Sequence, residues 1–238
     1  MKINIAWLYP ELLNLYGDYG NIVTFQKRLA WRNIDCSVTQ YHLKDTIDFD
    51  SADLVFLGGG SDREQLLIAK QLSAFRRPFQ EYVEKGGVCV AICGGYQLLG
   101  NYYDSASQRI EGLHILDIYT ENGEGRLIGN TAVQSDLVEM PVVGFENHGG
   151  RTFIGSHKPL GEAKALGNNG IDHMEGVLYK NVLGTYLHGP LFPKNPQLCD
   201  YFLQLAIRRK DSGFAGLPPL DDELERKANA FMANRHNF

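Results

Sequence analysis

The fold is decided by the stretch VCVAICGGYQ, which occupies residues 88–97. Its first five residues are apolar on both faces, which is typical of a strand buried inside a parallel sheet. Gly94 and Gly95 come soon after, and two residues without a Cβ atom permit a sharp turn. The pattern predicts a buried strand that ends at a tight turn on Cys93 and leads into a helix.

The sequence before this stretch has the same strand-and-helix arrangement. The apolar residues 54–57 run into three glycines, Gly58 to Gly60, and Ser61 and Glu64 form a capping box that begins a helix. Residues 2–8 are predicted to form a first strand. Apolar strands joined by helices indicate a parallel sheet that is covered on both faces.

The sequence after residue 113 changes character. Short strand-like pieces, among them residues 142–145 and 151–154, are separated by glycine and asparagine as far as residue 188. Strands packed so closely along the chain suggest antiparallel additions to the sheet. We therefore predict an α/β fold of three layers, αβα, with a largely parallel central sheet that antiparallel strands extend.

Composition and charge exclude several classes of protein. The formal net charge is −5 and no basic run occurs, so we expect no nucleic-acid partner. The longest apolar stretches are far too short to form a transmembrane segment, and the N-terminus is not typical of a signal peptide. The four cysteines form no CxxC pair, which favours free thiols and a cytoplasmic location.

The chain of 238 residues contains no evident linker. We predict a main domain over residues 1–210. Residues 211–238 are expected to form a loop and a charged helix, which are part of the same domain or peripheral to it.

Cys93 is the candidate nucleophile. In open α/β sheets, sites form beyond the carboxyl ends of the strands, and a sharp turn there would lift the sulfur out of the sheet. A helix N-terminus favours the thiolate, and the backbone N–H that follows is well placed to bind an oxyanion. The alternative is a buried structural cysteine, which is how we interpret Cys36, Cys89 and Cys199.

A thiolate nucleophile needs a base that later protonates the leaving group. His188 follows the strand-like residues 184–187 and precedes Gly189-Pro190, so we expect it at a strand's end too. A histidine on a surface loop is the alternative interpretation. His148 is the rival base, and it lies in the stretch FENHGGRT at residues 145–152.

These motifs together resemble those of the class I, triad-type glutamine amidotransferases. CGGYQ at residues 93–97 is similar to their nucleophile elbow, and LGGG at residues 57–60 is similar to their oxyanion loop. Residues 145–152, with YLHGP at residues 186–190, resemble the branch that includes cobyric acid synthase.

A narrower resemblance lies within this branch. It is to the GatD-type amidotransferase subunits of lipid II isoglutaminyl synthase, and it rests on NLYGDYGN at residues 14–21, GGGSDREQ at residues 58–65 and GTYLHGP at residues 184–190. The similarity spans about residues 1–210, which makes the main domain a glutamine amidotransferase domain. The full set of motifs is specific, although any single one would be weak.

The resemblance implies a role for each catalytic group. Cys93 would attack the side-chain amide of L-glutamine and form a thioester. His188 would protonate the leaving ammonia and then activate water to release glutamate. Backbone N–H groups of Gly59, Gly60 and Gly94 would hold the oxyanion.

Two further residues are implied to contact the substrate. Arg126 matches the family's substrate-contacting arginine, and a guanidinium binds a carboxylate through two hydrogen bonds. A solvated arginine on a hairpin is the alternative. Gln97 would line the substrate pocket, although a helix cap or a buried amide is an equally good interpretation.

One departure from the family pattern concerns the third catalytic group. Most class I amidotransferases read His-x-Glu, whereas this chain has Pro190 at the third position. A proline cannot orient an imidazole, so the site is a dyad or takes its acid from elsewhere. Glu146 and Glu175 are internal candidates, and our hypothesis is that a partner subunit supplies the carboxylate.

Missing motifs indicate that the chain acts with a partner. It has no Gly-x-x-x-x-Gly-Lys-Ser/Thr loop for nucleotide phosphates and no cluster with metal-site spacing. We therefore expect no cofactor and no metal in this chain. The resemblance implies a heterodimer with a Mur-ligase-like, ATP-dependent synthetase subunit that carries ATP and magnesium and amidates the D-glutamate of the peptidoglycan stem on lipid II.

Three alternatives remain open at this point. The ammonia could serve another acceptor, as in cobyric acid synthesis. The fold could be a non-catalytic binding module. The chain could also be a cysteine hydrolase of the related peptidase-like group, which would release no ammonia from free glutamine.

Overall fold

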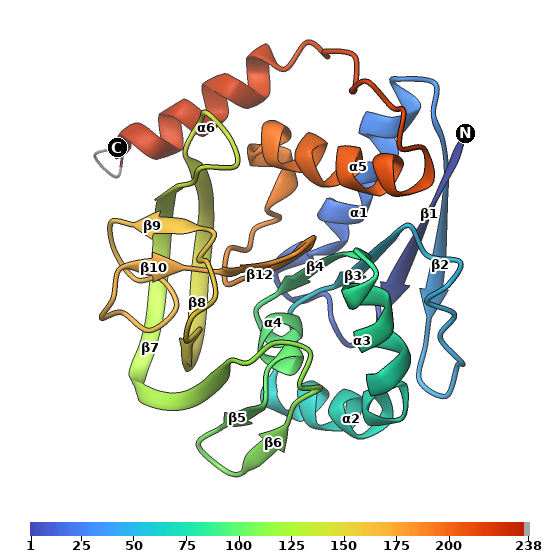
Figure 1. The fold of residues 1–238 in the computed structure, drawn as a ribbon. Coiled ribbons are helices and arrows are strands. Elements are labelled where there is room, and N and C mark those ends of the chain that lie inside the picture. Colours follow the sequence, from blue (N-terminus) through green and yellow to red (C-terminus); the bar gives the residue numbers. More distant parts are fainter. Residues whose placement is uncertain (236–238) are drawn as a thin grey trace.

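The computed structural model describes residues 1–235, which fold into two β-sheets with helices packed around the first (Figure 1). The strands of the first sheet are, in spatial order, β11 (Val177–Tyr179), β12 (Val182–Thr185), β4 (Val88–Ile92), β3 (Leu54–Leu57), β1 (Lys2–Leu8) and β2 (Asp35–Tyr41). All neighbours pair in parallel except β11 and β12. The predicted parallel sheet is confirmed.

The helices cover both faces of this sheet, as predicted (Figure 1). The helix layers consist of α1 (Tyr19–Ala30) and α5 (Pro196–Lys210) on one face and α2 (Asp62–Leu72), α3 (Arg76–Glu84) and α4 (Gly94–Leu99) on the other. Every residue of β3 and β4 is buried. This two-sided burial is the reason why the sequence of these strands is continuously apolar.

Three short 3-10 turns join these elements: η1 (Leu15–Gly17), η2 (Ser73–Phe75) and η3 (Phe192–Lys194). The predicted capping box is present at the start of α2, where Ser61 and Glu64 each bond the other's backbone N–H. It satisfies two amide groups that the first turn of a helix leaves free.

The antiparallel strands differ from the prediction, because only β11 extends the first sheet. The others form a second sheet in the order β10 (Met174–Glu175), β9 (Gly161–Ala163), β7 (Tyr119–Gln134), β5 (Tyr102–Asp104) and β6 (Arg109–Glu111), with β8 (Val142–Phe153) paired to β7. Residues 142–145 and 151–154, predicted as separate pieces, belong largely to the single strand β8. Gly149 and Gly150 lie within that strand and do not break it.

The long pair β7 and β8 explains why a second sheet forms. The two strands pair with each other on both sides of an irregularity between Asn122 and Leu127, and they therefore satisfy each other's backbone groups. A single bridge between Phe145 and His188 connects this sheet to the end of β12. The second sheet is thereby fixed beside the carboxyl ends of the first.

The C-terminal segment packs against both parts of the fold. The buried Arg28 of α1 forms ion pairs with Asp200 (2.7 Å) and with Asp222 (2.6 Å), which precedes α6 (Glu223–Arg235). Asn229 of α6 donates to the carbonyl of Pro141 (2.9 Å). Of the expected segment 211–238, residues 236–238 lie outside the described residues. No helix within residues 1–235 has the length and apolar character that crossing a membrane requires.

Candidate active site

The site lies at the carboxyl ends of β3, β4 and β12. In register, Leu57 of β3 pairs with Ala91 of β4, and Ile92 pairs with Thr185 of β12. The three strands therefore end side by side, and the glycine loop, Cys93 and His188 follow them. Sites in sheets of this type form where the strand order reverses. Here the order reverses at β1, which is the neighbour of β3 in the sheet.

Cys93 forms the predicted tight turn between β4 and α4. Its backbone has φ 48° and ψ −103°, a conformation that non-glycine residues rarely adopt. The Cys93 N–H donates to the carbonyl of Thr185 (2.8 Å), and the Gly95 N–H donates to that of Gly58 (3.2 Å). A Cβ atom on Gly94 would lie 2.9 Å from Gly60 N, so close packing requires glycine there.

Three side chains meet around Gly59. A Cβ atom built on this glycine would lie 2.6 Å from His188 Cε1, 3.3 Å from Asp18 Oδ2 and 3.4 Å from Cys93 Cβ. All three side chains are almost fully buried. The structure thus brings the predicted nucleophile and base together and adds a carboxylate that the sequence analysis did not assign.

Asp18 connects the glycine loop to His188. Its Oδ2 accepts a hydrogen bond from the Gly59 N–H (2.6 Å), and its Oδ1 lies 3.5 Å from His188 Nδ1. The carboxylate that Pro190 cannot provide is therefore present within the chain. The hypothesis that a partner subunit supplies the acid rested on the absence of an acid at position 190, and Asp18 removes this reason for it.

The charges around His188 favour its protonated form. Burial by itself lowers the pKa of this imidazole, but the Cys93 sulfur and the Asp18 carboxylate favour the cation more strongly and raise the pKa to about 10. At neutral pH, the His188 imidazole therefore holds strongly a proton that it receives from the Cys93 thiol.

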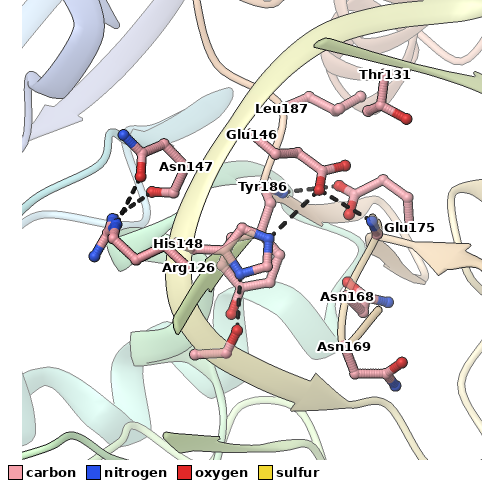
Figure 2. A network of polar contacts seen from close by, with 12 residues as sticks. Arg126, Thr131, Glu146, Asn147, His148, Asn168, Asn169, Glu175, Tyr186 and Leu187 are labelled. Atoms are coloured by element: carbon pink, nitrogen blue, oxygen red, sulfur yellow. Dashed lines mark hydrogen bonds and ion pairs between the residues drawn. The ribbon is translucent and has the colours of Figure 1, made fainter. Parts of the chain in front are cut away.

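His148 has very different surroundings. Its ring stacks on Tyr186 with 3.5 Å between the ring centroids, and its Nδ1 lies 2.8 Å from the Gly150 carbonyl. Burial lowers its pKa to about 4. Figure 2 shows its other nitrogen directed at Glu146, at 3.5 Å. His188, not the rival His148, is thus paired with Cys93.

A pocket of about 370 Å³ opens beside Cys93. Arg126 lines it and is held by Asn147: its Nε donates to the Asn147 side-chain oxygen and its Nη2 to the Asn147 backbone oxygen, both at 2.7 Å (Figure 2). The arginine lies where β7 and β8 lose their regular pairing. A fixed guanidinium at the pocket wall is suited to a carboxylate.

Comparison with known sequences agrees with this arrangement. The model of the CobB/CobQ-like glutamine amidotransferase domain matches residues 4–196. The chain belongs to the CobB/CobQ-like glutamine amidotransferase family. The expected class of enzyme, a glutamine amidotransferase, is thereby confirmed.

Several curated relatives are similar over much of this amidotransferase. The GatD subunit of a glutamine-hydrolysing lipid II isoglutaminyl synthase from Staphylococcus aureus is 43% identical, over 99% of this chain and 97% of that protein. Its counterpart from Streptococcus pneumoniae is 40% identical, over 95% and 88%. A cobyric acid synthase from Listeria innocua is 29% identical over 75% of this chain, but over only 36% of that longer protein.

Solved structures support the fold of the amidotransferase. PurLQS from Thermotoga maritima aligns with a TM-score of 0.58 at 16% identity, over 89% of this chain and all of that chain. A structure described as a glutamine amidotransferase aligns with a TM-score of 0.56 at 19% identity, over 84% and 98%. The predicted fold class is confirmed.

One predicted oxyanion donor, Gly59, has a hydrogen-bond partner within the protein. The Gly59 N–H donates to Asp18, so a substrate oxygen would compete with this carboxylate for it. Gly60 and Gly94 remain as candidates, and their backbones lie against each other beside Cys93. The sequence could not distinguish these glycines, because the partner of the Gly59 N–H is a carboxylate far away in the chain.

Gln97 lines the pocket of the amidotransferase, but both ends of its amide have partners in the protein. Its nitrogen donates to the Tyr186 hydroxyl (3.0 Å), and its oxygen accepts from Gln65 (3.0 Å). Of the interpretations offered for Gln97, the structure therefore supports the buried amide. A contact with substrate would come in addition to these bonds.

Glu146 and Glu175, the two internal candidates for the third acid, have other partners. Glu146 accepts from the Gly167 N–H (3.0 Å), and Glu175 accepts from the Tyr186 N–H (2.8 Å). Burial raises the pKa of each carboxyl to about 8. Asp18 was missed although it lies in the motif at residues 14–21, and its position in the loop between the first strand and the first helix was the available signal.

Proposed function

We propose that this chain hydrolyses L-glutamine at Cys93 and delivers the ammonia to an ATP-dependent, Mur-ligase-like partner subunit. The acceptor in this proposal is the D-glutamate of the peptidoglycan stem on lipid II. The observation that carries the hydrolytic step is the meeting of Cys93, His188 and Asp18 around Gly59. The near full-length similarity to two subunits of lipid II isoglutaminyl synthase supports the acceptor.

The first half of the reaction forms a thioester. The Cys93 thiol gives its proton to His188, and the sulfur attacks the side-chain amide carbon of glutamine. The oxygen gains negative charge, which the N–H groups of Gly60 and Gly94 would stabilise. His188 returns its proton to the nitrogen as the C–N bond breaks, and ammonia leaves.

The second half restores the enzyme. A water molecule gives a proton to His188 and attacks the thioester carbon. The C–S bond then breaks, glutamate leaves and the proton returns to sulfur. Asp18 would orient the imidazole and stabilise its cation in both halves.

The charges of the pocket support a free amino acid as substrate. Arg126 would bind the α-carboxylate, and the carboxylate of Asp62, which lines the same pocket, would bind the α-ammonium group. A guanidinium and a carboxylate in one pocket match the two opposite charges of glutamine.

Chemical arguments support the proposed partner and location. Amidation of a carboxylate needs ATP to activate it, and the sequence contains no Walker-type loop. We therefore assign ATP and magnesium to the partner subunit of a heterodimer. The free cysteines favour a reducing compartment, so we assign the complex to the cytoplasm.

The test uses this chain together with the subunit that copurifies with it. With glutamine, ATP and lipid II, we expect glutamate release and amidated lipid II. Cys93→Ala should abolish both with glutamine but leave amidation with ammonium chloride intact. The control is Cys36→Ala, since Cys36 is a partly buried cysteine on β2.

Three results would contradict the proposal. Glutamine-dependent amidation by Cys93→Ala would show that another group attacks glutamine. A copurifying subunit that amidates a corrinoid would move the acceptor to the cobyric type. Failure of a glutamine-like diazo-ketone to label Cys93 in the complex would favour a binding module.

A further inference from the structure

Tyr16 lies over the catalytic histidine. Its ring contacts the ring of His188 edge-on, with 5.0 Å between the centroids and an angle of 71° between the planes. It contacts Phe145 in the same way, at 5.6 Å. Tyr16 is 43% exposed, whereas His188 is fully buried. The tyrosine ring therefore forms part of the cover between His188 and solvent.

The hydroxyl of Tyr16 is connected to the substrate pocket. It accepts a hydrogen bond from the side-chain nitrogen of Asn147. The side-chain and backbone oxygens of the same asparagine accept from Arg126 (Figure 2). A continuous chain of hydrogen bonds thus leads from the arginine of the pocket to the residue that covers the catalytic base.

The backbone of Tyr16 is strained and is held on both sides. Its φ of 55° and ψ of 24° lie in the left-handed region, which an aromatic residue rarely adopts. On one side, the Leu15 N–H donates to the Gly59 carbonyl (3.0 Å), and on the other, Asp18 accepts from the Gly59 N–H (2.6 Å). Such strain persists where the surroundings enforce it, and it is concentrated at functional sites.

We propose that Tyr16 is a positioning residue that reports occupation of the pocket by a carboxylate to the catalytic histidine. In this inference, which rests on the proposed function, the α-carboxylate of glutamine fixes the guanidinium of Arg126. The arginine fixes Asn147, and Asn147 holds the Tyr16 ring closed over His188. Closure excludes water from the imidazole and the sulfur until the amide has reacted.

The test compares two substitutions in the complex with its partner subunit. Tyr16→Phe keeps the ring but loses the bond to Asn147, so KM for glutamine should rise about fivefold while kcat changes less than twofold. Tyr16→Ala also removes the cover, so kcat should fall at least about tenfold. Alkylation of Cys93 by iodoacetamide, which needs no carboxylate, should be faster in Tyr16→Ala and unchanged in Tyr16→Phe.

The control residue is Tyr19, which is similarly exposed (49%) but stacks on Trp7 rather than on His188. Tyr19→Ala should leave kcat, KM and the alkylation rate unchanged. A double-mutant cycle of Tyr16→Phe with Asn147→Ala measures the connection directly. The double variant should raise KM no further than Asn147→Ala alone.

The outcomes separate this inference from the proposed function. If the wild-type complex releases no ammonia from glutamine, the proposed function and this inference both fail. If the wild-type complex is active, two results would overturn the role of Tyr16 alone. One is a Tyr16 variant that keeps both the kcat and the KM of the wild type. The other is a cycle in which the KM effects of the two substitutions multiply.

Discussion

His188 and His148 are two buried histidines of one active site with opposite charge preferences. The pKa of His188 is raised to about 10, and that of His148 is lowered to about 4. Burial lowers both values, so the difference arises from the neighbouring groups. His188 faces a thiol and a carboxylate, whereas His148 lies against the ring of Tyr186 and the carboxyl of Glu146.

The state of Glu146 explains why a carboxyl beside His148 does not raise its pKa. Burial raises the pKa of Glu146 itself to about 8, so this group is largely uncharged at neutral pH. A neutral carboxyl cannot stabilise an imidazolium by charge. A nearby carboxyl group therefore identifies a catalytic histidine only if the carboxyl is ionised.

The largest expected effect comes from removing the charged histidine. His188→Ala should lower glutaminase activity about a thousandfold or more, because the thiol loses its proton acceptor and ammonia its proton donor. Ammonia and glutamate release at saturating glutamine measure this loss. Activity within tenfold of wild type would show that His188 is not the base.

The second effect sharpens the role of the carboxylate. Asp18→Asn should lower kcat about 10- to 100-fold, since the imidazolium loses the charge that stabilises it. The negative charge raises the pKa of His188, so its removal should move the alkaline limb of the pH profile from about pH 10 to lower pH. If Asp18→Asn keeps the alkaline limb and the kcat of the wild type, Asp18 is not the third acid, and the hypothesis that the partner subunit supplies it is favoured again.

A smaller effect is expected at the neutral histidine. His148→Gln should change kcat less than about tenfold, because this residue lines the pocket without contacting the nucleophile. Steady-state kinetics of the two histidine variants, assayed side by side, measure the contrast. A loss as large as that of His188→Ala would reverse the assignment of the base.

The smallest effect concerns stability rather than activity. The pKa of Glu175 is about 8 in the folded protein and near 4.5 when unfolded, so the stability that this group contributes is complete below pH 4.5 and is lost as pH rises through 8. Glu175→Gln should therefore lessen the fall in stability between pH 6 and pH 9 by about 2–3 kcal/mol, or the fall in Tm by roughly 5–10 °C. Its glutamine oxygen can still accept from Thr185 and Tyr186.

The control for this change is Glu139→Gln, at an exposed glutamate. It should leave the fall in Tm unchanged. An equal fall in Glu175→Gln and in the wild type would mean that the buried carboxyl titrates normally.

The sequence predicted those parts of the site that local patterns determine. The turn at Cys93 follows from a buried strand and two glycines, and His188 follows from its place after another apolar strand. Asp18 was not predicted, because its contact with His188 depends on how β1 and β12 are placed in the sheet. The second sheet was not predicted either, since β8 continues through glycines that resemble a break.

A substitution at Gly59 would disturb the geometry of this site without removing any reactive group. A single methyl group at this position would meet the imidazole, the carboxylate and the nucleophile's Cβ atom at the same time. Gly59→Ala would therefore retain every reactive side chain while losing their mutual alignment. This variant would therefore distinguish the contribution that the chain makes by assembling with its partner subunit from the contribution that it makes by hydrolysing glutamine.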